Sequence, residues 1–555
     1  ESYGLAAKRM AWPIISSTAT TVAAFLPLLF WPGVVGEFMK FLPMTVSSTL
    51  TASLLMALIF VPTLGATFGG GRGAADAARL KALARGEGGD LRALGGMTGL
   101  YVGVLSGALR HPGKVLVAAV IVLVGVWYAY SQYGRGIEFF PDVEPEAAVL
   151  HIHGRGNLSI DERDALVREV EAHVLAMDAE RDEFDSIYAV TMANAATDSE
   201  LAEDVIGTIQ LEFADWQRRR TADEILEEIR RRTAGLAGII VEPRKMEGGP
   251  PVGKPIQVQL SSAQPELLDP AIARLRAFVE SLPGVVDVED TRPVPGIEWQ
   301  LAVDRAEAAK YGVDVTTVGN SIQLVTKGLK FGDFRPDDSD DEIDIVARYP
   351  IHARSIAELD NIRVPAGDSF APISNFVERQ ARPKVGIINR VDGARVLAVR
   401  ADVLPGVLAD DKVREIRAWL AQADLDPRIT VEFKGEDEEQ RDSQAFLSKA
   451  FAVALFLIAI ILVTQFNSFY SAFLILTAVV MSTVGVLIGL LVTNQAFGIV
   501  MSGIGVIALA GIVVNNNIIL IDTFDQLRPT ESNPRDAILR TGAQRLRPVM
   551  LTTVT

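Results

Sequence analysis

Residues 469–493 read FYSAFLILTAVVMSTVGVLIGLLVT, a stretch without a single charged side chain. A helix that crosses a bilayer needs about 20 predominantly apolar residues, because the hydrocarbon offers no partner to unpaired backbone groups. Five more stretches meet this requirement, at roughly 12–31, 39–66, 114–132, 446–466 and 498–523. Buried helices of a large water-soluble protein seldom run uncharged for this length. The sequence therefore predicts a polytopic α-helical membrane protein with six spanning helices.

The charged residues lie apart from these apolar stretches. Of the 555 residues, 49% are hydrophobic and 22% are charged, and residues 135–440 hold most of the Asp, Glu, Arg and Lys. This segregation predicts a soluble domain between two groups of membrane helices. The net charge of -16 argues against nucleic-acid binding, which requires a basic face. The absence of cysteine excludes disulfides and thiolate metal sites.

Lys and Arg near the span ends predict the orientation, because cytoplasmic loops carry an excess of these residues. Between the second and third spans, basic residues outnumber acidic ones, with Arg72, Arg79, Lys81, Arg85, Arg92 and Arg110 against Asp76, Glu87 and Asp90. The stretch after the sixth span repeats the bias with Arg528, Arg535, Arg540, Arg545 and Arg547. Both segments are therefore expected in the cytoplasm and the soluble domain in the periplasm. Residues 73–96 suit an amphipathic helix on the cytoplasmic surface.

The soluble segment alternates short strands with charged amphipathic helices, which is typical of an α+β fold. From Ala147 onward the strand-like AAVLHIHG is followed by the helical DERDALVREVEAHVLAM and the strand-like SIYAVTM and GTIQLEF. A similar unit follows in IQVQLSS, a helix from Asp269 to Leu282, and GVVDVED. These repeated strand-helix-strand units predict stacked subdomains.

Two features of the soluble segment resemble metal ligands, but each has a more ordinary interpretation. His151 and His153 alternate along a predicted strand, so both are expected to face one side. Without a third ligand, surface or interface histidines are the favoured interpretation. The acidic run PDDSDDEID at residues 336–344 could hold a hard cation, although such runs are more often solvated surface. We therefore predict no metal-ligating residue.

The two ends of the chain carry related sequences. Residues 13–20 read PIISSTAT and residues 548–555 read PVMLTTVT, each preceded by a polar helix with basic residues. The chain therefore contains the seam between two homologous halves. Repeated membrane halves are a transporter architecture, with the working site between them.

Several long motifs, in order, resemble the resistance-nodulation-division (RND) efflux transporters. QFNSFYSAFLILTAVVMSTVGVLIGLLVT, GIGVIALAGIVVNNNIILIDTFDQLR and RLRPVMLTTVT are similar to the eighth to eleventh membrane helices of that family. Residues 12–64 resemble the fifth and sixth helices, and IEFFPDVEPE resembles the entry into the second periplasmic loop. The resemblance identifies an internal fragment, from helix five to the start of helix eleven, most similar to the hydrophobe/amphiphile efflux branch.

The resemblance implies a domain map. Membrane helices five and six occupy 1–66, a cytoplasmic linker with an amphipathic helix 67–112, and helix seven 113–134. Ferredoxin-like porter subdomains are expected at 135–295 and 386–442, with a docking subdomain inserted at 296–385. Helices eight to ten follow at 443–524, and a cytoplasmic helix with the start of helix eleven at 525–555.

The resemblance also implies a multi-pass protein of the bacterial inner membrane. It would form a homotrimer in contact with membrane lipid, a periplasmic adaptor (membrane fusion) protein, an outer-membrane channel and a small-molecule substrate. We find no nucleophile–base constellation, phosphate-cradling loop or membrane-protease motif. The expectation is a secondary active transporter that uses the proton gradient and no cofactor, not an enzyme.

The strongest candidate site is the run Asn515, Asn516 and Asn517 in the sixth span, because polar groups at membrane depth are costly. Neighbouring residues of a helix differ by about 100°, so the three amides cannot share one face. In the drug-pump branch of the family, lysine usually stands at the position of Asn515 and pairs with two aspartates on helix four. Asparagine there is a departure that changes the counter-charge of those aspartates, which this chain lacks.

The family's relay implies further roles. Arg545 and Thr552 match the arginine and threonine of helix eleven, so Thr552 is expected to be a relay contact and Arg545 a charge on the cytoplasmic side. Asn515 and Asn516 would form positioning hydrogen bonds. The alternative is that the asparagines only hold helices together, at about 0.6 kcal/mol each. Gly503, Gly505 and Gly511 are expected to permit close helix packing.

The substrate is less defined. In the family, the loop matching Met192 to Glu203 lines the substrate path, so Met192 and Asn194 are candidate path residues. We predict proton-driven export of small amphiphilic compounds or drugs. Two alternatives remain. One is a heavy-metal exporter, although its possible methionine ligands Met177, Met192 and Met246 are few and scattered. The other is a non-transporting scaffold or lipid-binding protein, which remains possible because Asn515 departs from the family's lysine.

Overall fold

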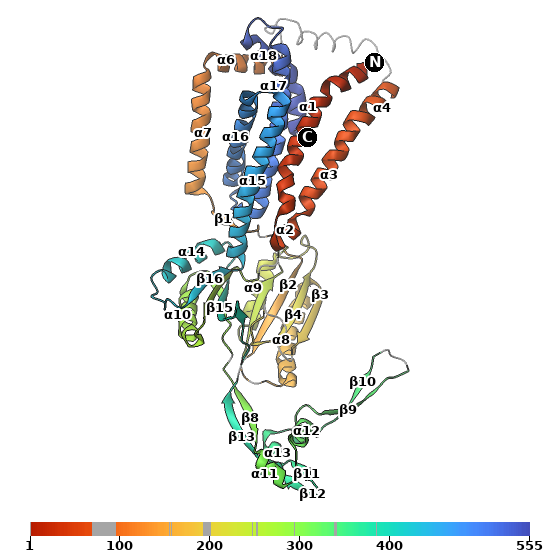
Figure 1. Cartoon of the computed structure of the whole chain (residues 1–555), viewed down its shortest axis with the longest axis vertical. Coiled ribbons are helices and arrows are strands. Elements are labelled where there is room, and N and C mark those ends of the chain that lie inside the picture. Colours follow the sequence, from red (N-terminus) through yellow and green to blue (C-terminus); the bar gives the residue numbers. More distant parts are fainter. Residues whose placement is uncertain are drawn as a thin grey trace.

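The computed structural model describes residues 2–68, 96–141, 143–154, 156, 158–192, 201–246, 248–250, 253–293, 295–337, 341–384 and 386–554; of 2–10, 66, 356 and 552–554 it describes only the backbone. The chain forms a helical bundle, two sheet units beside each other, and a distal unit farthest from the helices (Figure 1). This order along the long axis follows the predicted segregation of apolar and charged sequence.

Most of the helices belong to the bundle. They are α1 (Ser2–Phe25) with the 3-10 helix η1 (Leu26–Phe30), α2 (Gly33–Met39), α3 (Phe41–Leu55) with the π-helical η2 (Met56–Phe60), α4 (Val61–Phe68), α6 (Gly96–Arg110), α7 (Pro112–Tyr133), α15 (Glu436–Phe466), α16 (Phe469–Thr493), α17 (Ile499–Leu527) and α18 (Pro534–Val554). Among the residues that the structure describes, six stretches are long and apolar enough to cross a membrane: Ala11–Phe30, Gly33–Gly65, Pro112–Tyr133, Glu436–Phe466, Phe469–Thr493 and Ile499–Leu527. These confirm the six predicted spans.

Helices α1, α15 and α17 form the centre of the bundle. Their apolar side chains join one buried cluster that includes Phe25, Leu447, Ile458 and Val514. By contrast, the apolar windows of Gly33–Gly65 and Pro112–Tyr133 bury none of their residues inside the chain. A helix that is apolar all round and uncovered by protein suits lipid contact.

The described residues 96–110, which precede the third span, and the helix that follows the sixth span meet at one end of the bundle, opposite the sheets (Figure 1). There α6 packs on α18 so closely that a Cβ on Gly542 would lie 2.9 Å from Cε1 of Tyr101. This common location agrees with the predicted orientation. Two expectations need correction: residues 96–110, assigned to a linker, form the helix α6, and residues 534–554 form one continuous helix with Pro548 inside it. The amphipathic helix predicted at 73–96 lies outside the described residues except for its last position.

The first sheet unit is a four-stranded antiparallel sheet with two helices. Its elements are β2 (Ala147–Gly154), α8 (Ile160–Arg181), β3 (Phe184–Thr191), β4 (Val205–Phe213), α9 (Ala222–Thr233) and β5 (Ile239–Lys245), in the strand order β3-β4-β2-β5. Ser159 caps α8, since its side chain accepts from Glu162 N–H while the Glu162 carboxylate accepts from Ser159 N–H. Leu150, Val170 and Ile225 join the core between helices and sheet. The strands and helix predicted here are confirmed.

The second sheet unit has five strands. Its elements are β6 (Ile256–Ser262), α10 (Leu268–Ser281), β7 (Val285–Asp290), β14 (Arg390–Val391), β15 (Ala394–Val403), α14 (Ala409–Leu420) and β16 (Thr430–Lys434). The order is β14-β15-β6-β16, with β7 also paired to β15. The register of β7 on β15 shifts near Asp287, whose φ of 50° is left-handed. This irregular strand lies at the seam with the first unit.

The distal unit interrupts the second sheet unit. It contains β8 (Ile297–Val303), α11 (Arg305–Lys310), α12 (Val315–Val325), β9 (Leu329–Phe334), β10 (Ile343–Ala347), α13 (Ile356–Asn361), β11 (Arg363–Ala366), β12 (Ser369–Pro372) and β13 (Val377–Pro383). The entering strand β8 and the leaving strand β13 pair antiparallel, with Ile297 opposite Pro383. The described part of the acidic run 336–344 is mostly exposed, and its Asp344 pairs with Lys330 at 2.8 Å.

Candidate functional site

The asparagine run of α17 points in more than one direction. All three amides are half-buried. Asn515 Oδ1 accepts a hydrogen bond from the Ser17 hydroxyl of α1, whereas Asn517 Nδ2 donates to the Val513 carbonyl of its own helix at 3.2 Å. Asn515 and Asn517 thus point to different partners, and Asn515 links two spanning helices.

Helix α1 contributes a buried polar stripe that the sequence analysis did not assign. Ser16, Ser17, Thr20 and Thr21 are each at most 8% exposed. Thr21 Oγ1 donates to the Gly511 carbonyl of α17 at 3.3 Å, close to the Asn515 contact. The signal was available in ISSTATT, because residues four apart lie on one helix face. What the sequence alone does not give is the partner helix.

Among the described side chains, Arg545 contacts a residue of α17 other than Asn515. Arg545 Nε donates to the Thr523 hydroxyl at 2.7 Å. Thr523 lies two helical turns beyond Asn515, which is about 12 Å along the axis. Arg545 therefore ties α18 to the far end of α17, and the side chain of Thr552 lies outside the description.

The candidate substrate-path residues are only partly described. Met192 follows β3 and is half-buried; its N–H donates to the Ile206 carbonyl at 2.8 Å and its carbonyl accepts from Arg163. Asn194 lies outside the described residues. Met177 is core and Met246 is 51% exposed, so the three methionines do not gather into a soft-metal site.

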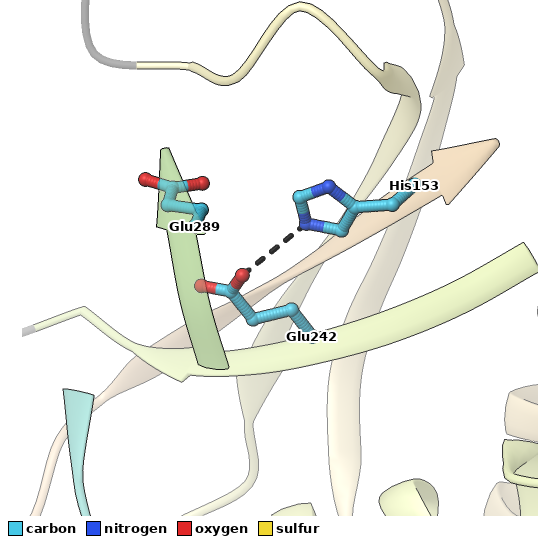
Figure 2. A group of neighbouring side chains, drawn as sticks. All are labelled: His153, Glu242 and Glu289. Carbon is cyan, nitrogen blue, oxygen red and sulfur yellow. Dashed lines mark hydrogen bonds and ion pairs between the residues drawn. The ribbon is translucent and has the colours of Figure 1, made fainter. Parts of the chain in front are cut away.

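A cluster of charged side chains lies at the seam of the two sheet units. His153 on β2 is buried, with its Nδ1 2.9 Å from Asp204 Oδ1 and its Nε2 3.2 Å from Glu242 Oε2 on β5. Figure 2 shows His153 and Glu242 joined in this way, with Glu289 of β7 beside them. One donor atom from each of these three residues falls within a group whose members lie within 4.8 Å of one another.

Lys254 supplies a cation to the same cluster. Its Nζ lies 2.9 Å from Glu242 Oε1, 3.7 Å from Asp402 Oδ2 and 3.9 Å from Glu289 Oε1, and it donates to the Asp287 carbonyl at 2.6 Å. Arg230 of α9 forms a bidentate pair with the Asp287 carboxylate at 2.7 and 2.6 Å. The Lys254–Glu242 and Arg230–Asp287 contacts connect the first sheet unit to the second through charge.

The electrostatics of the cluster follow from this pairing. Both ring nitrogens of His153 face carboxylates, which only accept, so the ring is the doubly protonated imidazolium. Burial alone would lower the pKa of His153, but Asp204 and Glu242 outweigh it and raise the pKa to about 9. Burial opposes ionisation of Glu242, yet His153 and Lys254 hold its pKa at about 2. For Glu289 and Asp402 burial wins, and their pKa values are raised.

His151 and His153 were expected to face one side of the strand, and both lie near Glu242, but their surroundings differ. A bulge between Ile152 and His153 shifts the register against β4, so strict alternation stops at that point. His151 is only half-buried, and burial lowers its pKa to about 4, which leaves it neutral. The sequence also gave no sign of Glu242 and Glu289, because they reach His153 only through the fold.

A large cavity separates the membrane helices from the two sheet units. Its volume is about 1110 Å³, and it is lined by the turn between α16 and α17, the start of α15, α9 and the loop after β15. Asp287 and Asp402 of the seam line it as well. The short strands β1 (Ile137–Glu138) and β17 (Phe497–Gly498) pair in parallel beside it and connect the exit of α7 to α17. The cavity therefore touches both the spanning helices and the charged cluster.

These features together are those of a membrane transport protein. The membrane bundle has a buried polar contact between spans, a charged cavity at its face and a large sheet domain beside it. The chain belongs to the AcrB/AcrD/AcrF family, whose description it matches over residues 3–555, and this confirms the predicted resistance-nodulation-division membership. Members of this family are transporters rather than enzymes.

Similar proteins include two metal-resistance pumps. The chain is 24% identical to the cation efflux system protein CzcA of Alcaligenes sp. (strain CT14), over 99% of this chain and 51% of that protein. It is also 24% identical to the cobalt-zinc-cadmium resistance protein CzcA of Cupriavidus metallidurans, again over 99% of this chain and 51% of that protein. The chain thus spans about half the length of these relatives.

A solved structure shares the fold. The crystal structure of a heavy metal efflux pump aligns with a TM-score of 0.73 at 20% identity, over 98% of this chain and 52% of that one. The α+β sheet units and the helical bundle are thereby confirmed as the architecture of this family.

Proposed function

We propose that the complete protein is a proton-driven exporter of divalent metal cations in the bacterial inner membrane. It would work as a homotrimer with a periplasmic adaptor and an outer-membrane channel, and the two sheet units and the distal unit would be its porter and docking subdomains. The observation that carries the proposal is the acidic cavity between the spanning helices and the sheet units.

The charges of this cavity suit a cation. Nine acidic and five basic side chains line it. The acidic residues are Glu138, Asp223, Glu227, Asp287, Asp402, Asp410, Asp411, Glu415 and Glu436, and the basic residues are Arg135, Arg230, Arg244, Lys245 and Lys412. An excess of one sign of charge in a cleft raises the local concentration of the opposite ion. Apolar side chains such as Phe139, Phe140 and Leu408 also line the cavity, so the excess of acidic side chains is what favours a cation.

The relatives support the same cargo. Their names describe cation efflux and cobalt-zinc-cadmium resistance, and the solved relative is a heavy metal efflux pump. These names favour the metal-exporter alternative over the amphiphile exporter that the sequence analysis put first. The small, polar character of MANAATDSELAE at residues 192–203 agrees with this choice.

For energy coupling we propose that Asn515 and Asn516, with Thr552 and Arg545, belong to a proton relay completed by residues outside this chain. The support is that Asn515 already connects two spanning helices through Ser17. A hydroxyl–amide pair in the membrane can reorient with the proton load of neighbouring carboxylates, because both groups donate and accept. Ser17 is a positioning residue in this arrangement.

The test is transport by the complete protein in a bacterium that lacks its own metal exporters. Cells are loaded with Zn²⁺, Co²⁺, Ni²⁺ or Cd²⁺, and retained metal is measured with and without a protonophore; a dye and drug panel is run in parallel. Metal retention that is low until the protonophore is added supports the proposal. Unchanged metal with lowered dye retention would establish the amphiphile exporter, and no effect on either would favour the scaffold.

A further inference from the structure

We propose that Glu203 and Lys384 form a releasable ion pair between the first sheet unit and the base of the distal unit, which opens when the two sheet units move relative to each other. Glu203 lies in the turn before β4, and Lys384 directly follows β13. Glu203 Oε1 and Lys384 Nζ lie 2.6 Å apart. The inference does not depend on which cargo the complete protein exports.

The connectivity of the chain gives this contact its significance. Residues 291–296 lead from the second sheet unit into the distal unit, and residues 384–389 lead back to β14. Figure 1 shows the distal unit joined to the rest of the chain through β8 and β13. The chain thus links the distal unit to the second sheet unit, whereas the Glu203–Lys384 pair links it to the first. A relative movement of the sheet units must therefore either break this pair or turn the distal unit at its base.

Backbone hydrogen bonds hold both partners in place. Val205 N–H donates to the Ala202 carbonyl at 3.1 Å, which closes the turn that carries Glu203. Lys384 N–H donates to the Gly296 carbonyl at 2.9 Å and so extends the pairing of β8 with β13. Formation of the ion pair therefore orders two side chains but no backbone, which keeps its entropic cost low.

Gly386 provides the space in which the Glu203 carboxylate lies. A Cβ at position 386 would lie 2.6 Å from Glu203 Oε2 and 2.5 Å from Pro293 Cβ. Pro293 belongs to the segment that enters the distal unit and Gly386 to the segment that leaves it. A residue without a Cβ permits this close approach. The carboxylate of the first sheet unit therefore lies where the two connecting segments meet.

The exposure of the pair suits a contact that opens. The Glu203 side chain is 16% exposed and the Lys384 side chain 38%. Partly exposed ion pairs shift an equilibrium by up to about fivefold, and salt weakens them. No described residue of the two connecting segments belongs to a helix or strand, so bending there disrupts no regular element. The competing interpretation is a static surface pair that does not affect where the distal unit lies.

Distances between spin labels on the complete protein in detergent separate these interpretations. The labels are attached through Ala172→Cys on α8 and Asn320→Cys on α12, both exposed, after any cysteine outside this chain has been replaced by serine. Each variant with one label measures the distances between copies. We expect Glu203→Gln to lower the ratio of closed to open protein by up to about fivefold, and added NaCl to act in the same direction.

Matched variants show whether the charge pair itself is responsible. Exchange of the charges, with Glu203→Lys and Lys384→Glu together, should restore the wild-type distances. Glu307→Gln should leave them unchanged, because Glu307 pairs with Lys310 at the same 2.6 Å but within one helix of the distal unit. Identical distance distributions in the wild type and in Glu203→Gln would overturn the proposal.

Two further variants test the space at Gly386 and the opening of the pair. Gly386→Ala keeps both charges but displaces the Glu203 carboxylate, so its distances should resemble those of Glu203→Gln; wild-type distances would contradict the proposal. Glu203→Cys combined with Lys384→Cys allows a short bismaleimide to hold the pair closed. This linkage should abolish export, whereas each cysteine alone should not.

Full export by the linked protein would show that the pair need not open. Absence of metal export before linkage would refute the proposed function instead, and the distances between spin labels would still test the ion pair.

Discussion

Gly511 allows α1 and α17 to approach each other, and its replacement tests this contact directly. A Cβ at position 511 would lie 3.0 Å from both Thr21 Cα and Ala24 Cβ, and 3.4 Å from the Thr21 carbonyl oxygen. Because backbone atoms and a short side chain cannot turn aside, α1 would have to move by a few tenths of an ångström. Overpacking of this kind costs about 1–3 kcal/mol.

Part of that cost is offset by helix propensity, since alanine is favoured over glycine by about 1 kcal/mol within a helix. We therefore expect Gly511→Ala to lower the stability by about 0–2 kcal/mol and Gly511→Val by more, because its branched side chain adds further contacts. The Thr21–Gly511 hydrogen bond and the Ser17–Asn515 contact should weaken with the same displacement.

The assay is the thermal unfolding of the complete protein in detergent, and α17 provides matched controls. Gly505 meets no described atom within 4 Å, so Gly505→Ala should be neutral or stabilising. Gly503 would meet only the flexible tip of Leu447, so Gly503→Ala should fall between the other two. If Gly511→Ala and Gly511→Val are as stable as the wild type, the close approach of α1 to α17 is refuted.

Three other predictions concern the seam and the membrane contact. The pKa of His153 is raised from 6.5 to about 9 in the folded protein, so protonated His153 stabilises the fold by about 3 kcal/mol at most. This stabilisation is complete below pH 6.5 and is lost as the pH rises to 9. The difference in unfolding temperature between wild type and His153→Gln should therefore shrink between these pH values. Arg230→Ala breaks the bidentate pair with Asp287 and should cost about 1 kcal/mol and raise protease cleavage between the sheet units, unlike Arg231→Ala on the same helix. Ser17→Ala should slow transport more than Thr18→Ala, measured as metal retention at equal expression; equal rates would contradict a positioning role for Ser17.

The membrane helices and most strands could be predicted because their signals are local. Uncharged runs such as 469–493 admit few alternatives, and the alternation in β2 and β4 gives the strands directly. Residues 96–110 were missed as a helix because their glycines and short length blur the pattern. The bulge between Ile152 and His153 was missed because it depends on the facing strand.

The candidate sites were less predictable because their members are far apart in the sequence. Asn515 was singled out by its cost in a membrane, but its partner Ser17 lies 498 residues away. His153 was expected to be a surface or interface residue and not a metal ligand, and the sequence did not indicate that Glu242 and Glu289 approach it from other strands. A sequence pattern indicates which residues could take part in a site, but the contacts between them depend on the tertiary structure.

The distal unit has a consequence for how the chain acquires its shape during synthesis. Strands β6 and β7 leave the ribosome first, but their partner β15 follows only after the whole inserted segment, and Asp290 must then find Val399. Closing so long a loop is slow while it is unstructured. Because β8 and β13 pair at the two ends of the insert, early folding of the distal unit shortens the flexible chain between β7 and β15 and so speeds their pairing. Shortening the insert to a tight β8–β13 hairpin should then leave the second sheet unit able to assemble, and faster.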